Sequence, residues 1–280
     1  MLAVSYAKIN LFLEVTGKLP NNYHRVNTVL CSIDLCDFIH YLPNSSGTID
    51  FTCSIQELNG HSNLVYRVAA YLKNRFHVAE GISIHLDKRI PIAAGLGGGS
   101  SNAANCMLAL NEIWRLGLTK IEQHAIASQF GSDINFFLEG GTALGENRGE
   151  QITLMETIIL KNILLVNPHI AIPSSAAYKL INLPSLKPPN LQTFNPSNLQ
   201  GACFNRLEAG IRKAYPEVDA LIKGIHDFGA EVAMLSGSGS TCFGLFKDQD
   251  TLQACKQAFT DKDYWTFETA TIPAAKPILK

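Results

Sequence analysis

The stretch "PIAAGLGGGSSNAA", residues Pro91 to Ala104, combines four glycines, two adjacent serines and the start of an alanine-rich segment. Glycine is entropically costly to order, so a cluster of glycines indicates that the backbone must approach another group closely. Backbone amides in a glycine-lined loop that leads into the N-terminus of a helix form a site for anions. The stretch therefore predicts a loop that binds a phosphate group.

The residues on both sides of this glycine loop have the periodicity that a phosphate loop requires. Residues 81–91, "GISIHLDKRIP", alternate apolar and polar side chains as a half-buried strand does, and Pro91 ends that strand. After the loop, Ser100 or Ser101 is expected to cap a helix whose apolar residues recur at helical spacing. A flexible linker would not be bracketed by a strand and a capped helix, so an anion-binding loop is favoured over a linker.

Two familiar phosphate motifs do not fit the glycine loop. A Walker loop requires a lysine after its last glycine, whereas Gly99 is followed by Ser100. The dinucleotide fingerprint G-x-G-x-x-G requires a glycine at position 100 as well, and the loop lies about ninety residues into the chain. The sequence therefore predicts a phosphate loop of a different kind.

The composition describes a globular protein with little net charge. Of the 280 residues, 46% are hydrophobic and 17% are charged, and the formal net charge is −1. A chain of this length forms one large domain or two smaller ones. Because no overall field attracts nucleic acid or an acidic membrane, neither is favoured as a partner. An anionic ligand must therefore be held by local groups.

The cysteines and the N-terminus both favour a cytoplasmic protein. The seven cysteines are scattered, without the paired spacing of a zinc or redox site, and are expected to be reduced and mostly buried. The histidines include no H-E-x-x-H motif. The apolar residues 1–15 are interrupted by polar side chains, are too short to span a bilayer and carry no cleavage pattern of a signal peptide.

Hydrophobic periodicity divides the rest of the chain into short strands and helices. In the first half it predicts strands at 7–17 and 47–54, and between them a turn at the start of 21–42 that is followed by two strands or a strand pair. It also predicts helices at 62–76 and 120–130, and a loop followed by a strand at 131–149. In the second half it predicts strand material at 156–168, a proline-rich surface loop at 184–196, helices at 205–229 with a break at Pro216, two strands joined by a glycine turn at 230–246 and a helix at 251–260. Ser62 or Asn63 is expected to cap the first helix. The order of elements in the second half suggests a split α+β sandwich.

The glycine loop resembles the second motif of the superfamily of small-molecule kinases that includes galactokinase, homoserine kinase and mevalonate kinase. Other segments narrow the resemblance to the family of 4-diphosphocytidyl-2-C-methyl-D-erythritol kinases. These segments are "YAKINLFLEVTGKLPNNYHRVNTVL", "SNLVYRVA", "LDKRIPIAAGLGGGSSNAA", "GSDINFFLEGGTALGENRGE" and "LSGSGSTCFGLF". They cover nearly the whole chain in the family's order. The glycine loop alone identifies the superfamily, whereas "AKINLFL" together with "YH" is more specific to this family.

The resemblance implies an α+β, two-domain small-molecule kinase fold with the active site in the cleft between the domains. Residues 1–154 would form an N-terminal, ribosomal-protein-S5-like domain that binds ATP. Residues 155–280 would form a C-terminal, ferredoxin-like domain that contributes to substrate binding. The implied reaction is phosphorylation of the 2-hydroxyl of 4-diphosphocytidyl-2-C-methyl-D-erythritol by ATP, on the non-mevalonate route to isoprenoids. The implied partner is this small cytidine-diphosphate-linked molecule, and the chain is expected to be a monomer or a homodimer.

Two residues are candidates for catalysis. Transfer of a phosphoryl group to a hydroxyl needs a carboxylate that takes the proton and a cation that stabilises the developing alkoxide. Asp133, in "GSDINFF", is the candidate base, and Lys8, on the first strand, is the candidate cation. Two structural alternatives are a loop aspartate that ends a helix and a surface lysine that snorkels. Asp34 and Asp37 lie in a strand-like segment and have no comparable support.

The acceptor is expected to contact four residues. Asn10 shares the face of Lys8 and could hydrogen-bond hydroxyl groups. The resemblance implies that Tyr23 and His24 contact the cytidine, through an aromatic face that stacks on the base and a polar edge that reads it. Tyr178 is expected to be the second stacking aromatic, from the other domain. Without the resemblance, "NNYH" is typical of a turn and a lone Tyr178 is typical of a core.

The nucleotide is expected to contact the glycine loop and its surroundings. The candidate ATP-binding residues are Asn63, Leu64, Lys88, Pro91, Ala93, Ala94, Gly95, Leu96, Gly97, Gly98, Gly99, Ser100, Ser101, Gly237 and Gly239. The two glycines of "SGSGST" match the third motif of the superfamily, and a tight hairpin is the structural alternative. Magnesium is expected with ATP. Spacing assigns no acidic ligand to it, and Ser100 or Ser101 could contribute.

The chain departs from the family pattern at two places. The family commonly has proline where this chain has Asn135, so the backbone after Asp133 is expected to be less rigid. Residues 145–150, "GENRGE", are a looser match to a glycine-rich segment. Neither departure removes a chemical group, so activity is still expected.

Three other functions compete with the kinase of this family. The first is a related kinase for homoserine or mevalonate, which would have no use for a base-stacking pair. The second is a non-catalytic ligand sensor, which the presence of both Lys8 and Asp133 disfavours. The third is a nucleic-acid-binding module, which the lack of a basic stripe disfavours.

Overall fold

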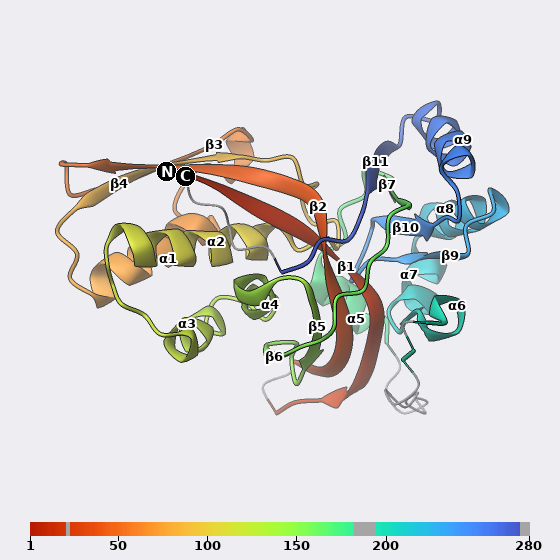
Figure 1. Cartoon of the computed structure of the whole chain (residues 1–280), viewed down its shortest axis with the longest axis horizontal. Coiled ribbons are helices and arrows are strands. Elements are labelled where there is room, and N and C mark those ends of the chain that lie inside the picture. Colours follow the sequence, from red (N-terminus) through yellow and green to blue (C-terminus); the bar gives the residue numbers. More distant parts are fainter. Residues whose placement is uncertain (21–22, 182–193, 196, 275–280) are drawn as a thin grey trace.

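The computed structural model describes residues 1–20, 23–181, 194–195 and 197–274. Its strands form two sheets, one of seven strands and one of four. Figure 1 shows helices α1 to α4 gathered along the first sheet and α7 to α9 beside the second. This arrangement agrees with the predicted α+β, two-domain kinase fold.

Two long antiparallel strands, β1 (Leu2–Lys18) and β2 (His24–Asn44), are the centre of the first sheet. The order of the sheet is β3-β4-β2-β1-β8, and β5 continues from β2 to β6. The other strands are β3 (Ile49–Cys53), β4 (Gly81–Asp87), β5 (Thr142–Glu146), β6 (Gln151–Leu154) and β8 (Phe204–Asn205). β3 is parallel to β4, and β8 is parallel to β1.

β2 is one strand where the sequence predicted two strands or a strand pair. Its pairing with β1 shifts register in three places, after Tyr6, after Asn10 and after Val15 on β1. Such bulges add twist and let two long strands curl together without a break. Buried Thr28 and Asp37 within β2 have hydrogen-bond partners, so they do not interrupt the strand.

Four helices cover the first sheet. They are α1 (Leu64–Arg75), α2 (Gly98–Ile113), α3 (Lys120–Ala127) and α4 (Ile134–Glu139), and a 3-10 turn, η1 (Gln56–Leu58), precedes them. The side chain of Asn63 caps α1, as predicted, by accepting from the amide of Val65 at 2.9 Å. The apolar faces of α1 and α2 bury Val68, Leu72 and Met107 against β2 and β4. This packing holds the start of α2 beside β1.

The second sheet has the order β11-β7-β10-β9, and all its neighbours are antiparallel. Its strands are β7 (Ile163–Asn167), β9 (Val232–Leu235), β10 (Cys242–Leu245) and β11 (Trp265–Thr269). The helices of this half are α5 (Ser174–Lys179), α6 (Leu199–Ala202), α7 (Glu208–Ala214), α8 (Pro216–Asp227) and α9 (Gln249–Thr260). The chain order, strand, helices, two strands, helix, strand, is ferredoxin-like, as predicted. Pro216 separates α7 from α8, also as predicted.

The sequence was wrong about three local structures. α2 begins at Gly98 with Gly97 as its N-cap, so Ser100 and Ser101 lie inside the first turn and do not cap it. Residues 134–139 form helix α4, not a loop. The strand predicted over 156–168 is formed only by β7. The proline-rich loop at 184–196 lies, except for residues 194–195, outside the described residues.

The two halves of the chain are joined by more than one connection. β8, from the second half, pairs with β1 in the first sheet. Next to it, the guanidinium of Arg206 donates to both carboxylate oxygens of the buried Glu14 on β1, at 2.7 Å each. Bidentate pairs of this kind fix orientation as well as distance. The domain boundary between residues 154 and 155 stays a prediction.

All seven cysteines are free thiols, as expected, and five of them are buried. Within the described residues, no helix is long and apolar enough to cross a membrane.

Candidate active site

The buried ammonium of Lys8 is the centre of the candidate site. Lys8 lies on β1 with 3% of its surface exposed, so it is not a snorkelling surface lysine. Its Nζ donates a hydrogen bond to Oδ1 of Asn10, two residues along the same face of the strand. Nδ2 of Asn10 donates to the hydroxyl of Thr28 at 2.7 Å, and that hydroxyl donates to the carbonyl of Phe12 at 2.7 Å. These bonds fix Lys8 and Asn10 side by side.

The third glycine motif, in the turn after β9, lies close to this ammonium on β1. A Cβ atom built on Gly237 would lie 2.8 Å from Nζ of Lys8 and 3.1 Å from Oδ1 of Asn10. It would also lie 3.0 Å from the carbonyl oxygen of Gly95, in the glycine loop. Only a glycine lets the backbone of this turn approach so closely. The turn after β9 is therefore part of the candidate site and more than a hairpin.

The glycine loop is tied to both sheets. The amide of Lys8 donates to the carbonyl of Leu96 at 3.0 Å. From the second sheet, Oγ of Ser236 donates to the carbonyl of Gly95 at 3.1 Å, and the amide of Thr241 donates to the carbonyl of Ala94 at 3.2 Å. The loop is therefore held between the halves of the chain.

The N-terminus of α2 can bind an anion. The first amides of an α-helix have no intrahelical acceptor, and here they belong to Gly98, Gly99 and Ser100. Gly97, with a φ of 71°, turns the chain into the helix. Gly99 is exposed, and the nearest atom to a Cβ built on it would be Cδ1 of Leu64 at 3.9 Å. This open cradle of amides fits a phosphate.

The two serines of the loop differ in where their hydroxyls lie. Ser101 is buried, and its Oγ is hydrogen-bonded to Oγ of Ser5 at 2.8 Å, inside the domain. Ser100 is half-buried, and its Oγ lies 4.0 Å from the position of a Cβ on Gly131, beside the segment that carries Asp133. Of the two hydroxyls, that of Ser100 is the one on the side of the candidate base.

Lys88, predicted to bind ATP, has its ammonium in a buried network below the loop. Its side chain is 4% exposed, and its Nζ is paired with the fully buried carboxylate of Asp37 on β2. It also donates to Oδ1 of Asn102 at 3.1 Å. Asp37 accepts the amides of Arg89 at 2.7 Å and Ile90 at 2.8 Å. Asp37, which the sequence did not single out, therefore fixes the segment that leads into the glycine loop.

The remaining nucleotide candidates surround the loop. Nδ2 of Asn63 donates to the carbonyl of Leu58 at 3.0 Å while its oxygen caps α1, so this side chain is engaged within the protein. Leu64 opens α1 next to Gly99. Gly239 has a φ of 81°, and its amide donates to the carbonyl of Ser236 at 2.9 Å. Pro91 and Ala93 begin the glycine loop, upstream of the helix.

Asp133 is the residue just before α4, and its carboxylate interacts electrostatically with the side chains of Lys8 and Tyr178. Burial lowers the pKa of the Lys8 ammonium, and the charge of Asp133 acts in the opposite direction. Burial and the same carboxylate raise the pKa of Tyr178. Asp133 is half-buried, and its side chain does not accept a capping hydrogen bond from α4. The carboxylate is therefore not used to end or begin a helix.

Two of the three aromatic candidates, His24 and Tyr178, are in contact with each other. The rings of His24 and Tyr178 are stacked, with centroids 5.0 Å apart and planes inclined by 21°. Burial, and secondly the charge of Lys18, lower the pKa of His24, which favours a neutral ring. Tyr23 is 53% exposed, and the guanidinium of Arg148 lies 5.1 Å from its ring centroid. Since His24 and Tyr178 are in direct contact, a base can enter between them only if the rings separate.

No cluster of three or more histidine, cysteine, aspartate or glutamate side chains that could hold a metal ion occurs among the described residues. Magnesium commonly takes its ligands from substrate phosphates, water and one or two protein groups, so it needs no such cluster.

Several residues of the site carried no sequence signal. Thr28, Asp37, Asn205 and Ser236 act through their hydrogen bonds to other site residues. Nδ2 of Asn205, for example, donates to the carbonyl of Gly237 at 2.8 Å. Such partners are set by tertiary packing, and no motif marks them.

Models of two protein families match the chain. The model described as the GHMP kinases N terminal domain matches residues 63–141, and the GHMP kinases C terminal model matches residues 184–264. The first match contains the glycine loop and Asp133, and the second contains Gly237.

Curated relatives match most of the chain. A 4-diphosphocytidyl-2-C-methyl-D-erythritol kinase of Geobacillus sp. (strain WCH70) is 36% identical over 261 residues, which are 90% of this chain and 90% of that protein. The enzyme of the same name from Bacillus pumilus (strain SAFR-032) is 36% identical over 255 residues, which are 88% of each chain.

Solved structures agree with these relatives. A crystal structure of 4-(cytidine 5'-diphospho)-2C-methyl-D-erythritol kinase has a TM-score of 0.85 and 28% identity, and the match covers 97% of this chain and 100% of that one. The mevalonate kinase of Methanococcus jannaschii, at 14% identity and a TM-score of 0.70 over 97% of this chain and 98% of its own, shares the fold. The chain is thus a kinase, and it belongs to the 4-diphosphocytidyl-2-C-methyl-D-erythritol kinase family.

Proposed function

We propose that this chain transfers the γ-phosphoryl group of ATP to the 2-hydroxyl of 4-diphosphocytidyl-2-C-methyl-D-erythritol. The observation that carries the proposal is the buried ammonium of Lys8. A Cβ atom built on Gly237, in the third glycine motif, would lie 2.8 Å from this ammonium. The ammonium donates a hydrogen bond to Asn10 and interacts electrostatically with the carboxylate of Asp133. A loop of free helix amides lies beside it. Phosphoryl transfer needs this combination, since it depends on positioning and on stabilising charge.

In this proposal Asp133 accepts the proton of the acceptor hydroxyl. Lys8 stabilises the negative charge that develops on that oxygen, and Asn10 holds the hydroxyl and the ammonium in register. The amides of Gly98, Gly99 and Ser100 bind phosphate oxygens at the start of α2.

The aromatic residues are proposed to select the acceptor. Tyr23, His24 and Tyr178 offer two faces and a neutral imidazole edge to a cytosine base. Homoserine and mevalonate contain no base, so such a group would serve no purpose for them. The names of the relatives, at 36% identity, support the cytidine-linked acceptor.

Magnesium is proposed to enter with the nucleotide, and when bound it would neutralise charge on the phosphates. Ser100 is the protein hydroxyl on the correct side of the loop to assist. We propose further that the enzyme acts in the cytoplasm as a monomer or a homodimer on this small molecule.

The test is ADP release from ATP and magnesium with three acceptors offered separately: the cytidylyl methylerythritol, mevalonate and homoserine. Turnover with the first alone supports the proposal. Turnover with either of the others instead would leave phosphoryl transfer intact but remove the base-binding role. A folded protein that binds ATP and turns over none of them would favour the ligand sensor.

Two variants test the catalytic roles. Lys8→Ala and Asp133→Asn should each lose most of the turnover while the protein keeps its fold. The first removes the cation that stabilises the alkoxide, and the second removes the base. Circular dichroism and ATP binding are the controls for folding. An active variant would remove that residue from the scheme.

A further inference from the structure

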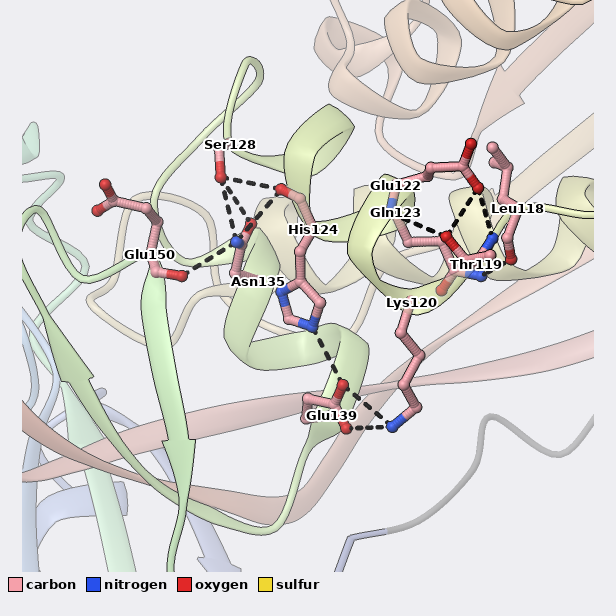
Figure 2. A network of polar contacts seen from close by, with 10 residues as sticks. All are labelled: Leu118, Thr119, Lys120, Glu122, Gln123, His124, Ser128, Asn135, Glu139 and Glu150. Carbon is pink, nitrogen blue, oxygen red and sulfur yellow. Dashed lines mark hydrogen bonds and ion pairs between the residues drawn. The ribbon is translucent and has the colours of Figure 1, made fainter.

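Helix α4, which begins next to Asp133, is attached to α3 at both of its ends (Figure 2). Near its start lies Asn135, 3% exposed, and at its end lies Glu139. The two attachments use different chemistry and lie at different distances from the candidate base. They therefore offer a way to separate the stability of the helix from the position of Asp133.

The carboxamide of Asn135 contacts two other segments. Its Nδ2 donates to the carbonyl of His124 at 3.3 Å and to Oγ of Ser128 at 3.1 Å, at the end of α3. It also donates to the carbonyl of Glu150 at 3.0 Å, in the turn before β6. One buried side chain thus connects the helix of the candidate base to α3 and to the turn 147–150. Asn135, which stands where the family commonly has proline, thus gives the segment a side-chain anchor, and the lower backbone rigidity expected here stays a prediction.

The attachment at the other end is an ion pair on the surface side of α4. Oε1 of Glu139 lies 3.1 Å from Nε2 of His124, and Oε2 lies 2.8 Å from Nζ of Lys120. Figure 2 shows these contacts at the opposite end of α4 from Asn135. They stabilise the same helix pair without touching the segment that carries Asp133.

The position of Asp133 depends on the backbone at the start of α4. Its side chain accepts no capping hydrogen bond from the helix, so the carboxylate is oriented by the chain that carries it. Asn135 is two residues further along, inside the first turn. An error of about 1 Å in a reacting group can cost about 10²-fold in rate. The first turn of α4 must therefore be held firmly.

We propose that Asn135 is a positioning residue, whose carboxamide fixes the first turn of α4 and thereby the place of the Asp133 carboxylate. The proposal rests on the proposed role of Asp133 as the base. Asn135 does not touch the reacting atoms and acts through the backbone.

The same carboxamide connects the base to the acceptor end of the site. The turn bonded by Asn135 contains Arg148, whose amide donates to the carboxylate of Glu150 at 2.9 Å and whose guanidinium lies over the ring of Tyr23. Loss of the carboxamide should therefore raise the KM for the cytidine-linked acceptor. The KM for ATP should not change, because the glycine loop is held by Lys8, Ser236 and Thr241.

The experiment compares Asn135→Ala with Glu139→Gln in the full-length enzyme, by steady-state kinetics and thermal unfolding. Both variants should unfold at lower temperature. Only Asn135→Ala should lose kcat, by about 10- to 100-fold, with a raised KM for the acceptor. Glu139→Gln should keep the kcat of the unaltered chain. Asn135→Ser retains a small hydroxyl and should be intermediate, and it replaces Asn135→Ala if that variant does not fold.

The outcomes distinguish this proposal from the one on which it rests. If Asp133→Asn is inactive and both Asn135 variants keep full kcat, the positioning role is wrong while the base remains. If Glu139→Gln loses kcat as much as Asn135→Ala does, the effect belongs to the helix pair as a whole, and the positioning role is also wrong. If Asp133→Asn keeps full turnover, both proposals fail.

Discussion

The substitution Gly237→Ala tests whether the turn after β9, the glycine loop and Lys8 on β1 lie close together, because it adds a single methyl group at their meeting point. The added Cβ would lie 2.8 Å from Nζ of Lys8, 3.0 Å from the carbonyl oxygen of Gly95 and 3.1 Å from Oδ1 of Asn10. Real Cβ atoms almost never come this close to other heavy atoms, so at least one of these groups must move. The glycine-loop carbonyl is backbone and is bonded to Ser236, so the ammonium is the group that yields.

The expected loss of activity follows from that displacement. Lys8 must give up its hydrogen bond to Asn10 or shift together with it. A shift of several tenths of an ångström to about 1 Å should lower kcat by about 10- to 100-fold. That loss corresponds to about 1.4–2.7 kcal/mol in the activation barrier.

The expected loss of stability is smaller and can be matched by a control. Position 237 has a φ of 55°, in the left-handed region, where a residue with a Cβ costs about 1–2 kcal/mol. Gly117 has a φ of 68°, and a Cβ built there has nothing within 4 Å. Gly117→Ala therefore imposes similar backbone strain without contact at the site.

The assay is steady-state ADP release, with urea unfolding of both variants as the measure of stability. Both should lose about 1–2 kcal/mol of unfolding free energy. Only Gly237→Ala should lose turnover. A Gly237→Ala enzyme with unaltered kcat would show that the turn after β9 does not meet Lys8 in the working enzyme, and the site as described would be refuted.

Three further predictions concern charge. Burial lowers the pKa of the Lys8 ammonium below its usual 10.5. The ammonium should therefore lose its proton, and kcat should fall, at a pH below 10.5. A kcat that stays constant up to pH 10.5 would contradict the role of the ammonium. Asp37→Asn leaves the buried ammonium of Lys88 unpaired, so the free energy of unfolding in urea should fall by about 3–5 kcal/mol. Adding Lys88→Met to this variant should restore part of that free energy, because it removes the unpaired charge. Burial alone would raise the pKa of Glu139, but hydrogen bonds from two basic side chains outweigh it and lower that pKa below the usual 4.5. A lowered carboxyl pKa stabilises the fold above pH 4.5, and the contribution disappears as the pH falls through the folded-state value. The difference in Tm between the unaltered chain and Glu139→Gln should therefore shrink from pH 7 to below pH 4, and a constant difference would contradict the ion pair.

The sequence predicted the elements whose signals are local. The cap of α1 by Asn63, the break at Pro216 and the two strands around the glycine turn at 236–241 were all recognisable. Each depends on a residue type and its immediate neighbours, through capping, ring geometry or alternation. The resemblance to the kinase family added the architecture of the two domains.

Local signals failed where packing outweighs propensity. Residues 134–139 follow a glycine, a serine and an aspartate, which are typical of a loop, yet they form α4 because Phe136 is buried and Asn135 finds three partners. β2 was expected to break but continues, because register shifts against β1 let the two long strands curl together. Neither the burial nor the bulges can be read from a window of ten residues.

The sequence by itself determined the chemistry available to this protein: a glycine loop before a helix, a lysine and an asparagine on one strand face, and an aspartate. Only the tertiary structure decided which of these groups meet. Lys88 is paired with Asp37 because the register of β2 and β4 places Phe38 opposite Asp87, one residue from each partner. Its role at the nucleotide stays a prediction. Gly237 reaches Lys8 because the second sheet docks its turn against β1. The physical reason is that a buried charge pairs with the opposite charge that the sheet register places within a few ångströms of it. That register depends on two segments far apart in the sequence, so no local pattern reveals the partner.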